Sequence, residues 1–261
     1  MDLSRFSMEG RTVIITGGSG GIGRGCARAF ASAGANIVIA SVPADSIPPA
    51  LEEIEKLGSQ ALGISVNVAE PLELDRMVGE TLQRFGRIDA LINVAGGSYS
   101  RNPDMPQYKR SSLSEMDGED FVGAYVGNVK TAFLASRAVI PHLQKSGKGS
   151  ITNIGSIAGL DRKPSSPDIA AYGTAKAAVH SLTVHMAHQW GPQVRVNCIA
   201  PGTIDTPRPE GTVRPEMAQA AQRIAVGRVG VGDDIGSVAL FLASDAAGFV
   251  NGIVIPVHGG E

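Results

Sequence analysis

Apolar residues along the chain gather in seven short runs that are rich in β-branched side chains. These runs predict buried strands at residues 12–16, 36–40, 62–68, 90–94, 150–154, 194–199 and 253–257. Between them, apolar residues recur at helical spacing and predict helices at residues 22–33, 49–57, 72–85, 120–143, 170–190 and 233–242. Because strands and helices alternate, the pattern predicts an α/β fold with a doubly wound, mostly parallel seven-stranded sheet and helices on both faces.

The alternation runs through the chain without a linker, so residues 1–261 are expected to form a single domain. Two stretches do not fit the pattern, at about residues 96–118 and 202–225, and both are rich in polar residues and proline. Long loops inside a compact domain are more often functional than idle. We therefore expect these two stretches to line a substrate pocket.

Composition narrows the class of protein and its partners. The chain has 43% hydrophobic and 18% charged residues, which is ordinary for a globular protein, and its net charge of -2 lacks the positive field that nucleic acid requires. Cys26 and Cys198 cannot form a disulfide framework, and no apolar run approaches the roughly 20 residues of a membrane span. These features predict a cytoplasmic protein with neither a membrane nor a nucleic-acid partner.

A glycine-rich turn joins the first predicted strand to the first predicted helix. Gly17 permits a tight turn, Gly21 lets the backbone approach a pyrophosphate, and Gly23 lets helix and strand pack closely. The N-terminus of the helix would face the anion. The turn predicts a Rossmann-type dinucleotide site, although by spacing alone an ordinary glycine-rich turn is the alternative.

Further motifs follow in an order that resembles the short-chain dehydrogenase/reductase family over about residues 10–260. They are Thr16-Gly-x-x-x-Gly-Ile-Gly23, Asn93-Val-Ala-Gly96, Asn128, Ser156 at the end of a strand, Tyr172-x-x-x-Lys176, and Pro201-Gly202 followed by Thr206. Val94 replaces the second asparagine of the family's Asn-Asn-Ala-Gly. His258 replaces the aspartate of its terminal Val-Asp-Gly-Gly, which leaves the role of that position open. The order of the motifs is specific, whereas no single motif is.

Tyr172 and Lys176 are four residues apart on a predicted helix, so one helix face carries both side chains. An ammonium beside a phenol would stabilise the phenolate and make the tyrosine a usable proton exchanger near neutral pH. Taken alone, the pair fits a solvated aromatic–cation contact better, and its strand context is what favours catalysis. Ser156 could donate a hydrogen bond to a substrate oxygen, or it could cap a turn.

The resemblance implies hydride transfer between the nicotinamide C4 and a carbonyl carbon, with Asn128, Ser156, Tyr172 and Lys176 as catalytic residues. Tyr172 would exchange the proton of the substrate oxygen. Asn128 would hold a water that links Lys176 to solvent, or it would satisfy backbone groups at a helix irregularity. The spacing of Ser156 and Tyr172 exceeds the family's, which indicates an insertion near residues 161–168 that should bulge outward.

The resemblance also implies a set of cofactor-binding residues at the carboxyl ends of the strands. The set comprises Gly17, Ser19, Gly21, Ile22, Gly23, Ser41, Asn67, Val68, Asn93, Ala95, Gly96, Tyr172, Lys176, Pro201, Gly202, Thr203, Ile204 and Thr206. Ser41 stands where NAD-specific relatives carry an acidic residue, and Val42 stands where NADP-specific relatives carry arginine. Because no lysine or arginine occurs from residue 29 to residue 55, the sequence favours NAD over NADP.

Three histidines on one predicted helix, His180, His185 and His188, do not form H-E-x-x-H, and no other ligand cluster accompanies them. No metal site is therefore expected, and these histidines are interpreted as structural or solvated. Cys26, just after the glycine turn, is interpreted as a small buried packing residue.

Together these features predict an NAD(P)-dependent oxidoreductase that interconverts a secondary alcohol and a ketone, with 3-oxoacyl substrates included. A non-catalytic dinucleotide-sensing protein on the same fold is the alternative, but it would be expected to lack Tyr172 or Lys176, and both are present. The same pair disfavours a methyltransferase, which also places glycines after a first strand.

The two long predicted helices, 120–143 and 170–190, carry more small and apolar residues than one sheet face needs, which predicts a homotetramer, or failing that a dimer.

Overall fold

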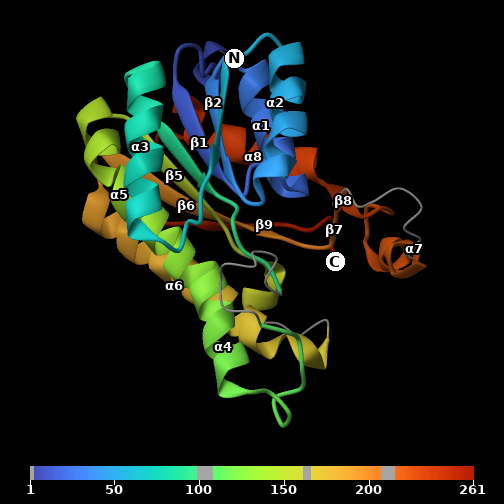
Figure 1. Ribbon diagram of the computed structural model, residues 1–261. Helices are drawn as coiled ribbons and strands as arrows, with labels where there is room; N and C mark the ends of the chain where they lie inside the picture. The colour runs from blue at the N-terminus through green and yellow to red at the C-terminus, as the bar shows by residue number, and fades with distance from the viewer. Residues whose placement is uncertain (1–2, 99–107, 161–165, 207–214) are drawn as a thin grey trace.

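The computed structural model describes residues 3–98, 108–160, 166–206 and 215–261. Seven parallel strands form the central sheet in the order β3-β2-β1-β4-β5-β6-β9 (Figure 1). The strands are β1 Thr12–Thr16, β2 Asn36–Ser41, β3 Ala61–Ser65, β4 Ala90–Asn93, β5 Gly149–Ile154, β6 Val194–Pro201 and β9 Val254–Val257. This order reverses at β1, as in a doubly wound sheet, so the predicted fold class is confirmed.

Helices cover both faces of the sheet (Figure 1). One face carries α1 Gly21–Ser32, α2 Ile47–Lys56 and α8 Gly232–Ala243, and the other carries α3 Pro71–Phe85, α5 Thr131–Ser146 and α6 Ala170–Trp190. Along β1, Val13 and Ile15 pack into the first layer and Ile14 into the second, because successive side chains of a strand point to opposite faces. Within the described residues, no helix is long and apolar enough to cross a membrane.

The predicted helix at 120–143 is three pieces in the structure. Helix α4 (Gly118–Tyr125) continues through a π-helical turn at Val126–Lys130 into α5. At this turn the Asn128 Nδ2 donates to the Ala124 carbonyl oxygen at 2.9 Å, and the Thr131 hydroxyl donates to the Gly127 carbonyl oxygen at 3.0 Å. Side chains that bond carbonyls of their own helix accompany such widened turns, and the apolar periodicity alone does not reveal them.

Two other boundaries differ from the sequence prediction. The strand predicted at 62–68 ends at Ser65, because the Asn67 Oδ1 accepts the Ala69 N–H at 3.1 Å and turns the chain. The segment predicted as a loop at 202–225 contains helix α7, Pro215–Arg223, which begins at a proline, and strand β7, Ile204–Asp205, paired with β8, Gly230–Val231. Residues 99–107 and 207–214 of the two predicted substrate loops, and residues 161–165 of the predicted insertion, lie outside the described residues.

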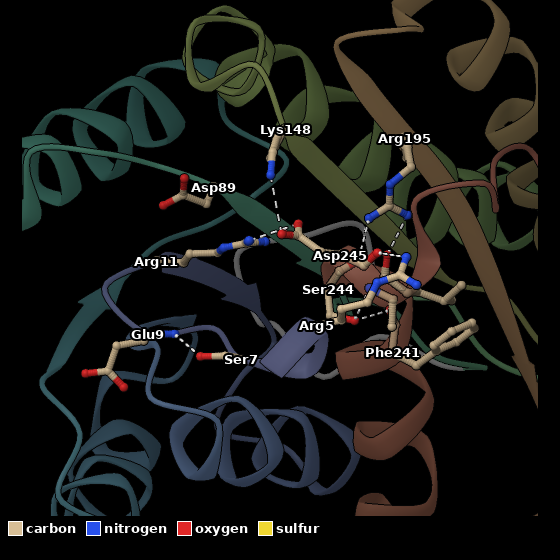
Figure 2. A network of polar contacts seen from close by, with 12 residues as sticks. Arg5, Ser7, Glu9, Arg11, Asp89, Lys148, Arg195, Phe241, Ser244 and Asp245 are labelled. Atoms are coloured by element: carbon tan, nitrogen blue, oxygen red, sulfur yellow. Dashed lines mark hydrogen bonds and ion pairs between the residues drawn. The ribbon is translucent and has the colours of Figure 1, made fainter. Parts of the chain in front are cut away.

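Ion pairs and capped carbonyls close the amino edge of the sheet (Figure 2). The Asp245 carboxylate binds Arg11 at 2.9 Å and Lys148 at 3.4 Å, just before β1 and β5 begin. Arg195, at the start of β6, donates to the Leu242 carbonyl oxygen at 2.7 Å and so holds the end of α8. Polar contacts therefore stabilise the amino edge of the sheet, whereas the carboxyl ends of the strands are where a ligand site is expected.

Helices α1 and α8 touch through their backbones at three glycines. A Cβ on Gly25 would overlap the carbonyl carbon of Gly232, and a Cβ on Gly236 would overlap the carbonyl oxygen of Gly25. Neither helix could approach so closely with larger residues, because backbone atoms cannot rotate out of the way. The contact sets the position of α1, and with it the position of the glycine turn.

We expect Gly25→Ala to lower the free energy of unfolding by about 1–3 kcal/mol, because the added methyl group forces the two helices apart. Gly79→Ala is the matched control, since Gly79 lies on an exposed part of α3 with open space around its Cα, and it should raise stability by roughly 0.5–1 kcal/mol. Chemical denaturation of both variants measures the difference. Equal stability of the two variants would contradict the contact.

Candidate active site

The structure brings three predicted catalytic residues together at the carboxyl end of β5. Ser156 lies two residues after this strand, and Tyr172 and Lys176 face it from α6. The Lys176 Nζ lies 5.7 Å from the centre of the Tyr172 ring, and the Ser156 side chain is close enough to the Tyr172 phenol to lower its pKa. The Lys176 ammonium donates to the Ile154 carbonyl oxygen at 2.8 Å. Residues far apart in sequence therefore form one cluster of proton-exchanging groups.

Burial governs the protonation of this cluster. It raises the pKa of Tyr172 above its ordinary value, against the hydrogen bond from Ser156, which lowers the pKa. Burial also lowers the pKa of Lys176 to about 8, so the side chain is mainly an ammonium at neutral pH. The Lys176 ammonium bonds the Ile154 carbonyl oxygen and burial dominates the pKa of Tyr172, so the expected stabilisation of the Tyr172 phenolate by Lys176 stays a prediction. Tyr172 is thus a neutral phenol that can donate a proton.

Ser156 has the capping role that its sequence position suggests, and its hydrogen bond to a substrate oxygen stays a prediction. Its Oγ accepts the Ala158 N–H at 3.1 Å and so caps the short 3-10 helix η4, Ile157–Gly159. This bond uses a lone pair of the hydroxyl and leaves its O–H free to donate to Tyr172 or to a substrate oxygen. The Ser156 backbone N–H donates to the His180 Nε2 at 3.5 Å. His180, interpreted from the sequence as structural or solvated, therefore lies beside the site, and its four-residue spacing from Lys176 was a usable signal.

Asn128 is 1% exposed and lies on the π-helical turn. Its Oδ1 accepts the Gly97 N–H at 3.1 Å, and its Nδ2 donates to the Gly97 carbonyl oxygen at 3.0 Å. The structural role that the sequence left open for Asn128 is therefore present, and the water-holding role stays a prediction.

The Tyr108 hydroxyl also donates to the Gly97 carbonyl oxygen at 2.8 Å, and burial raises the pKa of Tyr108 to about 12. Sequence patterns give no signal for Tyr108.

The glycine turn forms a cradle in which side chains would clash. Gly17 has φ of +64°, and a Cβ there would lie 3.0 Å from the Ala95 backbone nitrogen, which places two predicted cofactor residues in contact. A Cβ on Gly23 would overlap the Gly17 carbonyl oxygen. The N-cap of α1 is Gly20, with no side-chain cap and no acidic residue in the first turn, so an anion meets no competing carboxylate. These features fit the pyrophosphate of a dinucleotide.

Gly21 has a neighbour that the sequence did not predict. A Cβ at this position would lie 2.6 Å from the Thr206 Cβ, so glycine admits the chain that follows β6. Thr206 and the glycine turn therefore lie together, although their motifs are far apart in sequence. The expected approach of Gly21 to a pyrophosphate stays a prediction.

Three serine hydroxyls converge at the end of β2. The Ser19 Oγ lies 2.6 Å from the Ser41 Oγ and 2.8 Å from the Ser46 Oγ. Arg24 and Arg28, on the neighbouring helix, both bind Glu53. The hydroxyl cluster fits ribose hydroxyl groups, and both guanidinium groups already have carboxylate partners, since Arg28 also binds Asp233.

Other predicted cofactor residues have structural partners. Asn93 is buried, and its Nδ2 donates to the Asn153 Oδ1 and to the Ser136 Oγ, both at 2.9 Å. Its side chain therefore ties β4 to β5 and α5. At the end of β6, the Thr203 backbone N–H donates to the Glu261 Oε2 at 2.7 Å, and its hydroxyl donates to the Glu261 Oε1 at 2.8 Å. Glu261 is a further residue of this edge that sequence reasoning missed.

The remaining predicted cofactor residues occupy the edge formed by the carboxyl ends of the strands. Gly202 donates its backbone N–H to the Val257 carbonyl oxygen at 3.0 Å and packs against His258. The others are Ile22 in the first turn of α1, Val68 after β3, Gly96 after β4, Pro201 at the end of β6 and Ile204 in β7. Within the described ranges, no three His, Cys, Asp or Glu side chains gather as metal ligands would.

Known proteins show what this arrangement is similar to. A family model described as enoyl-(acyl carrier protein) reductase matches residues 17–261. The chain is 35% identical over 255 residues to a 7alpha-hydroxysteroid dehydrogenase of Escherichia coli (strain K12), covering 97% of this chain and 94% of the relative. It is 32% identical to the 3-oxoacyl-[acyl-carrier-protein] reductase FabG of Thermotoga maritima, covering 97% of this chain and 98% of the relative.

A solved structure agrees with these relatives. The 7 alpha-hydroxysteroid dehydrogenase complexed with NADH and 7-oxo glycochenodeoxycholic acid superimposes with a TM-score of 0.88 at 34% identity, covering 100% of this chain and 97% of that one. The family model, the relatives and the fold all span essentially the region over which the sequence motifs occur. The chain therefore belongs to the short-chain dehydrogenase/reductase family.

Proposed function

We propose that Ser156, Tyr172 and Lys176 carry the proton chemistry of a reversible reaction between a secondary alcohol and a ketone. Family membership makes the protein an NAD(P)-dependent oxidoreductase that acts on alcohols and ketones, as the sequence predicted, and nothing in the comparisons supports the dinucleotide-sensing alternative. The observation that carries the proposal is the placement of Tyr172 and the buried Lys176 ammonium one turn apart on α6, where the Lys176 Nζ lies 5.7 Å from the Tyr172 ring and binds the Ile154 carbonyl oxygen close to Ser156.

The dinucleotide supplies the hydride when it is bound, and the residues of this chain manage the oxygen of the substrate. In ketone reduction, the Ser156 O–H donates a hydrogen bond to the oxygen on which negative charge develops. Tyr172, a neutral phenol in the structure, gives its proton to that oxygen. The Lys176 ammonium then stabilises the phenolate that remains, and oxidation of the alcohol reverses these steps.

The substrate class that the proposal names is a ketone or secondary alcohol on a bulky carbon skeleton. Two relatives act, by their names, on a hydroxysteroid and on a 3-oxoacyl group held by a carrier protein. Both contain a carbonyl or hydroxyl group within a larger molecule. Turnover measured on a 7-oxo bile acid, a 3-oxoacyl thioester and a simple cyclic ketone, each with both cofactors, distinguishes these skeletons.

The hydroxyl cluster of Ser19, Ser41 and Ser46 supports NAD as the preferred cofactor. A 2′-phosphate needs a cation beside it, and the neighbouring Arg24 is already bound to Glu53. The cluster can exchange hydrogen bonds with ribose hydroxyls without such a cation.

Apolar side chains on α4, α5 and α6 support a homotetramer. Val122 on α4 is 54% exposed, Phe133 on α5 is 40% exposed and Val184 on α6 is 39% exposed, although α5 and α6 also pack on the sheet. Pairing of these helices with those of a second subunit would bury the exposed apolar surface.

We also place the protein in the cytoplasm, since Cys26 and Cys198 are buried free thiols, as expected in a reducing compartment.

Tyr172→Phe removes the ionisable oxygen and keeps the ring, so turnover should fall by roughly two to four decades while cofactor binding survives. Lys176→Ala should lose turnover and also bind cofactor more weakly, because it removes the ammonium and an expected ribose contact. Ser156→Ala should lower kcat with little change in cofactor affinity. Steady-state kinetics and cofactor titration by fluorescence measure these effects. Near-normal turnover of Tyr172→Phe would rule out this assignment of the proton donor.

NAD(H) should support turnover at least as well as NADP(H), because the end of β2 presents hydroxyl groups and no unpaired guanidinium. The measurement is kcat/KM for each cofactor at a fixed substrate concentration. Ser41→Asp should strengthen the preference for NAD(H), since a carboxylate binds ribose hydroxyls and repels a phosphate. A hundredfold preference of the unaltered protein for NADP(H) would overturn the proposal.

Light scattering should give the mass of a homotetramer at micromolar concentration, with a dimer as the smaller alternative. Phe133→Lys should shift the assembly towards smaller species, because it places a charge on the exposed apolar face of α5. Leu72→Lys is the control, since Leu72 is 83% exposed in the first turn of α3 and does not belong to the apolar residues of α4, α5 and α6 named above. A stable monomer of the unaltered protein would contradict the assembly.

A further inference from the structure

His180 lies where the backbone on either side of Ser156 meets α6. Its Nε2 accepts the Ser156 N–H at 3.5 Å, and the ring also lies beside Gly159, where an added Cβ would be 3.0 Å from the His180 Cε1. These two contacts lie at opposite ends of the turn that carries the Ser156 hydroxyl. The histidine is 8% exposed, so it is a part of the interior wall behind the site.

Two glycines of this turn, Gly155 and Gly159, lie next to the imidazole. A Cβ on Gly155 would overlap the His180 Nε2 and lie 2.8 Å from the Cys198 Sγ, and a Cβ on Gly159 would lie 3.0 Å from the His180 Cε1. Both glycines have ordinary backbone angles, so neither is explained by a left-handed conformation. The missing Cβ of Gly155 provides the room that the ring occupies, and the missing Cβ of Gly159 lets the turn approach the α6 backbone at Lys176 and Ala177, with the ring next to it.

We propose that His180 is a positioning residue that holds the Ser156 turn through its neutral imidazole. The inference rests on the proposed function, in which the Ser156 hydroxyl binds the substrate oxygen. With Nε2 as the acceptor, the proton of the neutral ring is on Nδ1. Because Nε2 bonds the backbone of Ser156 and not its hydroxyl, the histidine fixes where the Oγ lies without reacting itself.

The charge of the ring is central to this role. A protonated imidazole carries hydrogen on both nitrogens and cannot accept the Ser156 N–H. Two titratable groups lie beside the ring: the Lys176 ammonium on the same helix and the Cys198 thiol on β6. Burial raises the pKa of the Cys198 thiol to about 12, so this thiol stays neutral. Burial and the neighbouring ammonium lower the pKa of His180 below its ordinary value, against the Gly159 hydrogen bond, so the ring is neutral at pH 7. Protonation at lower pH would release the turn.

His180→Leu should lower kcat about tenfold, the effect expected from loss of one hydrogen bond, and leave the affinity for NADH unchanged. His180→Gln keeps an acceptor oxygen near the position of Nε2 and cannot be protonated. It should therefore restore most of kcat and remove the fall in kcat at acidic pH that we expect of the unaltered protein. His188→Gln, an exposed position two turns further along α6, is the control and should change neither quantity.

A second measurement needs no turnover. In the perdeuterated protein labelled with 15N-serine, the Ser156 amide resonance should shift with pH at the same midpoint as the His180 ring, below pH 6.5. This shift should be absent in His180→Gln. Gly155→Ala should displace the ring and abolish the same coupling, which provides a readout if His180→Leu does not fold.

The outcomes separate the two proposals. Wild-type kcat and an unchanged acidic limb in both His180 variants would overturn the positioning role, as would a Ser156 amide that ignores the titration of His180. Failure of the unaltered protein to turn over any ketone or alcohol would overturn the proposed function instead, and the amide measurement would still decide whether His180 holds the turn.

Discussion

The hydrogen bond from the Lys176 ammonium to the Ile154 carbonyl oxygen is the contact on which the site depends. Burying a cation is costly unless polar groups receive it, so this bond fixes α6 against the last residue of β5. Once Lys176 is fixed, Tyr172 lies one turn before it and His180 one turn after it, and both face the Ser156 turn. One register between a helix and a strand thus places the whole group of proton-exchanging residues.

Absent side chains contribute as much to this architecture as the polar residues do. Gly25 lets α1 touch α8, and Gly17 lets the first turn approach the chain after β4. Gly155 similarly admits the imidazole of His180, and Gly159 admits the α6 backbone at Ala177. In each case a backbone or ring occupies the volume of a missing Cβ, and tight packing leaves no room for an alternative arrangement. Substitutions at these positions should therefore affect the fold or the site through displacement of a neighbour.

The two edges of the sheet divide stability from chemistry. At the amino edge, the Asp245 carboxylate binds Arg11 and Lys148, and Arg195 caps carbonyls at the end of α8 (Figure 2). At the carboxyl edge lie Ser156, Tyr172 and Lys176 and the glycine turn, and the strand order reverses at β1, as in open parallel sheets that bind ligands at this edge. Changes at one edge can then be tolerated without loss of the other.

The sequence by itself determined the fold class, the family and the identity of the residues that meet at β5, because strand periodicity, glycine spacing and the Tyr172-x-x-x-Lys176 pair are local patterns. It could not determine the π-helical turn at Asn128, the partners of Tyr108 and His180, or the bond that directs Lys176 to a carbonyl and not to the Tyr172 oxygen. These depend on distances between segments that are far apart in the chain. Burial and three-dimensional packing set them, and neither is encoded in the spacing of residues along one helix or strand.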